Sequence, residues 1–153
     1  MVQEQTSFTV AEVEVSYKSN YNITERPKIN CSKDAYRILM QHWQSSKIEL
    51  LEEFKVILLN SSNRALGIVD ISTGGVQGTL ADPKIIFAVA LKTNSSKLIL
   101  AHNHPSGNTI PSEADRILTQ KLKDGGKLLD IDVCDHLIVT NHGYYSFADE
   151  CII

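Results

Sequence analysis

Short apolar runs and amphipathic stretches alternate along most of this chain. Apolar runs of strand length predict buried β-strands at residues 54–59, 65–71, 98–101, 131–140 and 144–147. Apolar residues at helical spacing predict a helix capped by Ser32 and two further helices that begin near Pro83 and Ser112. Because strands and helices alternate, we expect an α/β fold in which a sheet carries helices on its faces.

The pattern before Cys31 is different. Apolar residues alternate with polar ones from Phe8 to Tyr17, with one slip near Ala11-Glu12, which predicts a strand or a hairpin arm. Residues 20–27 are mostly polar and read as a linker. We therefore divide the chain into an N-terminal strand and linker extension, residues 1–30, and a single domain, residues 31–153.

Composition excludes several classes of protein. A length of 153 residues suits one domain with its own core. The net charge of -3 does not match the basic surface of most nucleic-acid binders, although Lys18, Arg26 and Lys28 are candidates for a local basic patch. No apolar run has the length of a membrane span or the character of a signal peptide, so we expect a cytoplasmic protein. The three cysteines are widely spaced, without a C-x-x-C pair, and are expected to be reduced.

Polar residues suited to metal binding gather directly after the apolar run 98–101. His102 and His104 are two positions apart, so both side chains point to the same side of the strand. Pro105 and Gly107 then turn the chain, and Ser112 opens a helix with Asp115 in its first turn. Two imidazoles and one carboxylate are three metal ligands that leave a coordination position open, as catalytic zinc sites do.

Each half of this stretch also has a purely structural interpretation. Ser112-x-x-Asp115 before an apolar helix has the form of a capping box, and the two histidines alone would fit a strand end. Their joint occurrence favours a metal site, and an iron site with two histidines and one carboxylate fits the same ligands. The H-E-x-x-H motif and the cysteine pair of zinc deaminases are absent from the sequence.

The same residues resemble the JAMM (MPN-plus) metallopeptidases, whose signature is H-x-H, seven residues, then S-x-x-D. Five segments resemble the RadC branch of that family: Ala101–Gly107, Arg64–Gly67, Gly78–Leu80, Leu129–Ile131 and Asp135–Ile138. The likeness runs from about Cys31 to the C-terminus. It implies a single JAB/MPN domain, a mixed β-sheet flanked by helices in a cytidine-deaminase-like architecture.

The resemblance also implies a mechanism. A Zn²⁺ ion would be held by His102, His104 and Asp115 with water as fourth ligand, and Ser112 would donate to the oxyanion. A glutamate before the strand at Phe54 would be the general base; the family pattern Glu-x-Phe selects Glu52, with Glu53 as the alternative. These roles predict a zinc metallohydrolase that cleaves a peptide or isopeptide bond in a protein or peptide substrate.

Two questions stay open at this point. RadC proteins usually carry an N-terminal helix-hairpin-helix module, and the residues before Cys31 are too few for one, so the chain resembles the short relatives. The alternative function is a DNA-repair or DNA-processing accessory role in which the metal site is structural or vestigial. Asp135-His136, within a predicted strand, either orients a metal ligand or forms a buried pair without a catalytic role.

Overall fold

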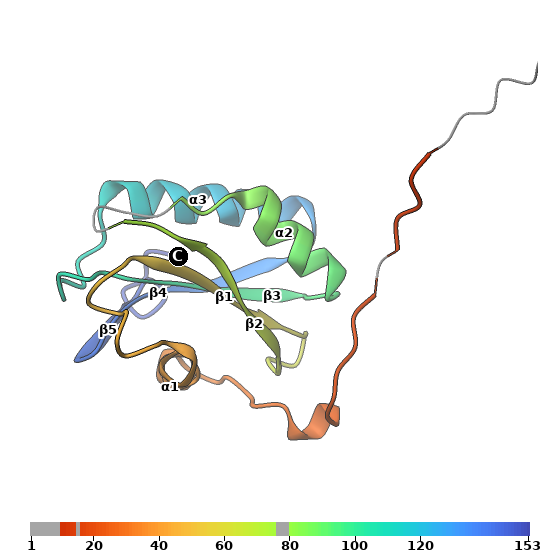
Figure 1. The fold of residues 1–153 in the computed structure, drawn as a ribbon, viewed down its shortest axis with the longest axis horizontal. Coiled ribbons are helices and arrows are strands. Elements are labelled where there is room, and N and C mark those ends of the chain that lie inside the picture. The colour runs from red at the N-terminus through yellow and green to blue at the C-terminus, as the bar shows by residue number, and fades with distance from the viewer. Residues whose placement is uncertain (1–9, 15, 76–79) are drawn as a thin grey trace, which may run out of the picture.

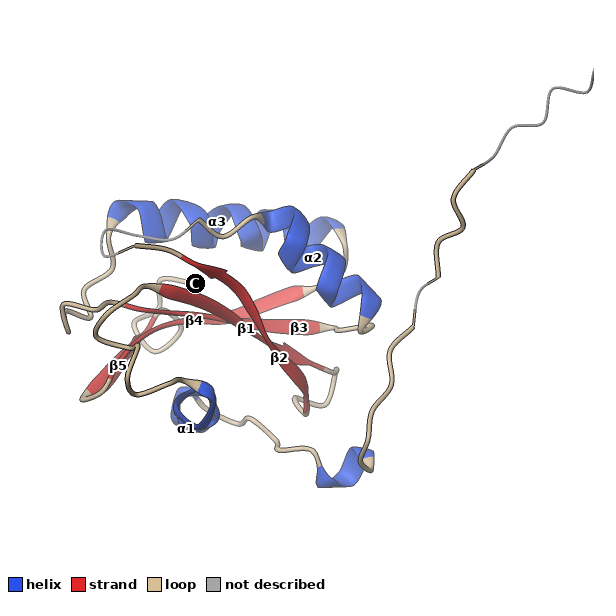
Figure 2. Cartoon of the chain, viewed as in Figure 1, coloured by secondary structure: helices blue, strands red, loops and turns tan. Residues whose placement is uncertain are grey.

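The computed structural model describes residues 10–14, 16–75 and 80–153, which form a sheet between two helical layers (Figures 1 and 2). The helices are α1 (Ser32–His42), α2 (Pro83–Lys92) and α3 (Glu113–Leu128), and a short 3-10 turn, η1, spans Ile23–Glu25. The strands are β1 (Glu53–Leu59), β2 (Ala65–Thr73), β3 (Lys97–Asn103), β4 (Asp132–Thr140) and β5 (Gly143–Ser146). The predicted α/β class is therefore confirmed.

The sheet is mixed, in the order β2-β1-β3-β4-β5. β3 and β4 run parallel, and every other pair is antiparallel. A parallel pair needs a long crossover connection, and α3 supplies it. As a result, the start of α3 follows the end of β3 after one short loop.

Alternation along the central strands divides the core between the two faces of the sheet. One cluster packs under α1 and includes Ile57, Ile99 and Leu137. The other packs under α2 and α3 and includes Val56, Leu100 and Leu122. In Figure 1, α1 lies on one side of the sheet, with α2 and α3 on the other. A residue's position in its strand therefore decides which layer it faces.

The start of α1 differs from the expectation in one detail. The N-cap residue is Cys31, without a side-chain cap, and the helix itself begins at Ser32. The Ser32 hydroxyl donates instead to Asp149 at 2.6 Å and contacts the Tyr144 hydroxyl at 3.0 Å. The hydroxyl that the sequence assigned to capping therefore binds residues far away in the chain.

The strand predicted between Phe8 and Tyr17 is not formed by those of its residues that the structure describes. Residues 10–14 and 16–19 have no regular secondary structure and are exposed, while Phe8, Val15 and Gly78 lie outside the described residues. In Figure 1, residues 10–14 and 16–19 extend away from the domain. Alternation alone does not make a strand, because a strand also needs a neighbour for its backbone groups. Of the helices that the structure describes, none is both long and apolar enough to cross a membrane.

Candidate metal centre

Two imidazole rings meet at the end of β3. His102 is buried within the strand, and His104 is the first residue after it. Their side chains point to the same side, as the alternation predicts, and their Nε2 atoms are 3.0 Å apart. Gly107, with φ of 80°, turns the loop behind them, and its N–H donates to the His104 carbonyl. The turn that glycine allows brings the chain back towards α3.

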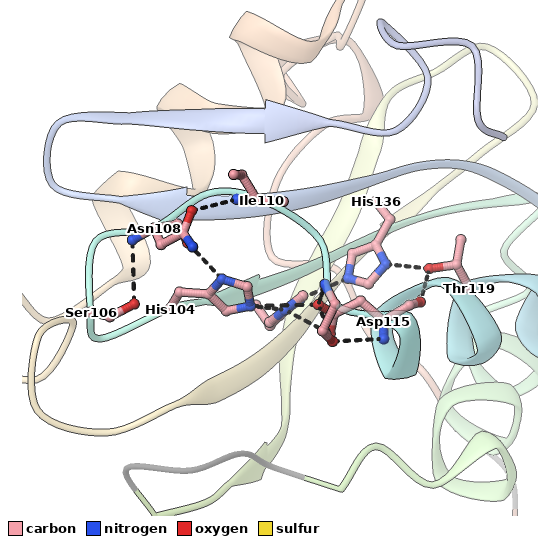
Figure 3. A network of polar contacts seen from close by, with 9 residues as sticks. His104, Ser106, Asn108, Ile110, Asp115, Thr119 and His136 are labelled. Carbon is pink, nitrogen blue, oxygen red and sulfur yellow. Dashed lines mark hydrogen bonds and ion pairs between the residues drawn. The ribbon is translucent and has the colours of Figure 1, made fainter.

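Asp115 reaches the two rings from the first turn of α3 (Figure 3). Its Oδ1 lies 3.2 Å from His102 Nε2, and its Oδ2 lies 3.6 Å from His104 Nε2. The predicted capping box is also present: Ser112 is the N-cap and accepts from the Asp115 N–H. The Ser112 N–H and hydroxyl each donate to Asp115 Oδ2 at 2.7 Å. One carboxylate therefore caps the helix and faces both histidines.

The far side of each ring is held by a hydrogen bond. His104 Nδ1 lies 2.6 Å from the carbonyl oxygen of Asn108, and a carbonyl only accepts, so Nδ1 carries the proton. In neutral His104 the Nε2 atom then presents a lone pair to the cluster. His102 Nδ1 lies 2.8 Å from His136 Nε2, deeper in the molecule.

The electrostatics of the cluster favour a cation. Burial alone would raise the pKa of Asp115, but hydrogen bonds to His102 and His104, which form when each ring carries a proton at Nε2, hold this pKa well below its usual range. The hydrogen bond to Asp115 raises the pKa of His104 against the effect of burial, and the charge of Glu52 acts in the same direction. Negative charge and lone pairs thus converge on one point, where a proton or a metal ion is the natural partner.

His102, His104 and Asp115 consequently form a group that can hold a metal ion, with ligand atoms within 4.8 Å of one another. His102 is closed off from solvent, whereas 17% of the His104 side chain and 15% of the Asp115 side chain are exposed. An ion held there would therefore be reached from the His104 side. Catalytic zinc sites keep one coordination position for water or substrate, and the exposed side of this group would give access to such a position.

The two candidate glutamates lie in different places. Phe54 is the cross-strand partner of His102 and stacks on its ring, so the preceding residue Glu53 points to the other face of the sheet. There Glu53 is buried, with Oε2 3.8 Å from Lys55 Nζ. Glu52 is half-buried just before β1, and its charge acts on His104. This placement favours Glu52 over Glu53.

Asn103, between the two histidines, has a structural role that the sequence did not reveal. Its side chain points away from them and is fully buried. Its Oδ1 accepts from the Glu53 N–H at 2.7 Å, and its Nδ2 donates to the carbonyls of Ile48 at 2.6 Å and Leu51 at 2.8 Å. Through these three hydrogen bonds, Asn103 holds the segment that carries Glu52 against the strand that carries the histidines.

For His136, within its predicted strand, the sequence allows two roles: orienting a metal ligand, or forming a buried pair with Asp135. His136 lies on β4 beside β3, completely buried, and Phe147 stacks on its ring at 4.9 Å. Burial holds the pKa of His136 well below its usual range, and neighbouring His102 lowers it further, so the ring is neutral. The Asp135 carboxylate accepts hydrogen bonds from the Ser146 hydroxyl, the Ala148 N–H and the backbone N–H of His136, whereas the His136 ring has other partners.

These features define a class: an α/β domain with two histidines from a strand end and an aspartate from the following helix. The family model of the RadC-like JAB domain matches residues 29–152. The chain belongs to this RadC-like JAB domain family.

Curated proteins similar to this chain carry the name UPF0758. A UPF0758 protein from Flavobacterium johnsoniae is 44% identical over 132 residues, which cover 86% of this chain and 56% of that protein. A UPF0758 protein from Clostridium tetani is 39% identical over 140 residues, covering 90% of this chain and 58% of that protein. The chain thus spans about half the length of the curated relatives that it matches.

Proposed function

We propose that this chain is a zinc-dependent hydrolase that cleaves a peptide or isopeptide bond. The observation that carries the proposal is the spacing of the candidate ligand atoms. Bonds of about 2.0–2.1 Å in a tetrahedral zinc site place neighbouring ligand atoms about 3.3 Å apart. Here the corresponding separations are 3.0, 3.2 and 3.6 Å, between the two Nε2 atoms and from each to Asp115.

The donor set is suited to zinc. Imidazole nitrogen and carboxylate oxygen are ordinary zinc ligands, and three protein ligands leave one position for a reactant. A bound zinc ion would supply Lewis acidity and lower the pKa of a water molecule to about 7. The same three ligands would also accept Fe²⁺, so the identity of the ion is part of the proposal.

The chain's own residues then divide the remaining work. Glu52, close enough to act on His104, would take a proton from the attacking water and return it to the leaving amine. Ser112 is exposed and donates its hydroxyl proton to Asp115 in this structure. Since that hydrogen rotates about the Cβ–Oγ bond, Ser112 would be able to donate it to the developing oxyanion of the substrate.

The test separates metal binding from turnover. The purified chain, loaded with zinc, is expected to hold about one ion per molecule and to cleave a member of a mixed panel of fluorogenic peptides and lysine-linked isopeptides. Glu52→Gln should retain the metal while turnover falls by about a hundredfold or more. Glu53→Gln is the matched control at the neighbouring position and should keep most of the activity. Failure to bind zinc, or full activity in Glu52→Gln, would contradict the proposal.

The DNA-processing alternative predicts binding that weakens with salt, since phosphate contacts release counterions. Of the three basic residues considered for a local patch, Arg26 is buried, with its guanidinium 5.9 Å from the centre of the Tyr21 ring. Titration of DNA at low salt decides this question. A shifted electrophoretic mobility that disappears with added salt would favour the alternative.

A further inference from the structure

A line of buried hydrogen bonds runs from the candidate metal centre into α3. His102 Nδ1 is 2.8 Å from His136 Nε2, and His136 Nδ1 is 2.6 Å from the hydroxyl of Thr119. Thr119 in turn donates to the backbone carbonyl of Asp115 at 2.6 Å. Figure 3 shows His136 between the cluster and Thr119. The line thus starts at one candidate ligand and ends at the backbone of another.

The backbone carbonyl of Asp115, at one end of this series of hydrogen bonds, determines which atom donates in each of them. A carbonyl oxygen only accepts, and a hydroxyl has one proton, so Thr119 gives its proton to Asp115. The contact between Thr119 and His136 is then a hydrogen bond only if His136 Nδ1 donates. The ring of His136 is completely buried, and its two nitrogen atoms meet a hydroxyl and an imidazole rather than a carboxylate, so a second, charging proton has no partner there. His136 therefore accepts at Nε2, and His102 Nδ1 must donate to it. The lone pair of His102 is therefore at Nε2, 3.0 Å from His104 Nε2.

We propose that Thr119 and His136 are positioning residues that hold His102 in the tautomer able to bind a metal ion. This inference rests on the proposed metal site. If His136 Nε2 donated to His102 Nδ1 instead, His102 would carry its own proton at Nε2. That proton would point at Asp115 and occupy the metal position. Thr119, four residues beyond Asp115, thus decides between a metal-binding and a metal-excluding form of the same fold.

The surroundings of His136 support a fixed role for its ring. Phe147 stacks on it with an interplanar angle of 18°, and Phe54 meets it at 61° with the ring centres 5.7 Å apart. Phe54 also stacks on His102 at 6.0 Å. The ring of His136 therefore keeps both nitrogen atoms aimed at their partners, and the buried groups of the line gain most from being fully paired.

A pair of variants at Thr119 tests the inference without changing any ligand. Thr119→Val keeps the shape of the side chain and removes the hydroxyl, whereas Thr119→Ser keeps the hydroxyl. Zinc affinity, measured by competition with a chromophoric chelator, should fall about 10–100-fold in Thr119→Val, as for other partners of metal ligands, and should be largely restored in Thr119→Ser. Thr140→Val is the matched control, because Thr140 is also buried and donates its hydroxyl elsewhere, to the Gly143 carbonyl.

A second measurement needs no variant. Nitrogen-15 NMR of the histidine rings of the wild-type chain should show His136 protonated at Nδ1 and unprotonated at Nε2. The opposite tautomer, or unchanged zinc affinity in a folded Thr119→Val, would overturn the inference. His102→Ala separates the two proposals: if it too leaves zinc affinity unchanged, the metal site itself is wrong, and if it alone abolishes binding, only the role of Thr119 and His136 is wrong.

Discussion

Asn103 connects the strand that carries both histidines to the segment that carries Glu52. The Asn103→Ala variant would leave one backbone N–H and two carbonyls without partners in the interior. Each unpaired buried group costs about 1–3 kcal/mol, so we expect the free energy of unfolding to fall by about 3 kcal/mol or more. Urea denaturation measures this loss.

Asn141→Ala is the control for that measurement. Asn141 is exposed, and its amide donates to Glu49 at 2.9 Å, so its removal should change stability by no more than about 0.5 kcal/mol. Equal losses in the free energy of unfolding would show that the three hydrogen bonds of Asn103 do not stabilise the fold more than the exposed bond of Asn141 does.

At this scale the sequence predicts what alternation and local spacing determine. The shared direction of His102 and His104 follows from the period of a strand, and Asp115 follows from the first turn of a helix. His136 and Thr119 depend on distant partners: His102 and His136 are 34 positions apart, and Thr119 and His136 are 17 apart. No short pattern reveals such pairs, because only the folded sheet places β4 beside β3.

At the scale of the elements, the end of α3 packs closely against the segment that leads into β4. A Cβ atom added at Gly126 would lie 2.3 Å from the carbonyl oxygen of Ile131, a backbone atom that cannot move aside cheaply. Gly126→Ala should therefore destabilise the fold by about 1–3 kcal/mol, as overpacking does elsewhere. Thermal denaturation followed by circular dichroism tests this expectation.

Gly125 provides the comparison within the same helix. A Cβ atom there would lie 3.0 Å from the ring of Phe87, a half-buried side chain that can shift. Alanine also favours a helix over glycine by about 1 kcal/mol, which offsets the crowding. We expect Gly125→Ala to be much milder than Gly126→Ala, and the reverse order would contradict the packing described.

The elements themselves were largely predictable, with instructive exceptions. The apolar runs mark β1 to β5, and Ser112 with Asp115 marks the start of α3, because these signals are local. Ser32 was expected to cap α1 and bonds instead to residues more than a hundred positions away. The N-terminal alternation predicted a strand that the described residues do not form, since the pattern carries no information about a pairing partner.

For the whole molecule, the proposed zinc site predicts opposite responses to pH in the metal-free and zinc-loaded states. The hydrogen bond to Asp115 raises the pKa of His104 on folding, so this bond stabilises the metal-free protein below about pH 6.5. That contribution is lost as the pH rises through the raised pKa. Zinc binds the unprotonated ring, so stabilisation by zinc should grow over the same interval.

Scanning calorimetry between about pH 6 and pH 8.5 tests this expectation. Zinc at about 100 times its dissociation constant should stabilise the fold by about 2.7 kcal/mol at the upper end of the range. His104→Gln removes the titrating ring, so the decline of the metal-free protein should disappear. A metal-free protein that becomes more stable above pH 6.5 through His104 would refute the assignment.

The order of the strands is the part of the molecule that the sequence did not predict. The long helical connection between β3 and β4 is typical of a parallel pair, and α3 bears this out. Nothing in the runs themselves places β1 between β2 and β3 rather than at an edge. That choice is made by the combined packing of residues far apart in the chain, as in the clusters on the two faces.

The double use of Asp115 has a kinetic consequence. The same carboxylate accepts from the Ser112 N–H and faces both histidines, so unwinding of the first turn of α3 withdraws a ligand at the same moment. Fraying at a helix end is among the cheapest local openings in a protein. The residence time of a bound ion would then be set by how often this turn opens, and loading the site would slow hydrogen exchange at the amides of residues 113–116.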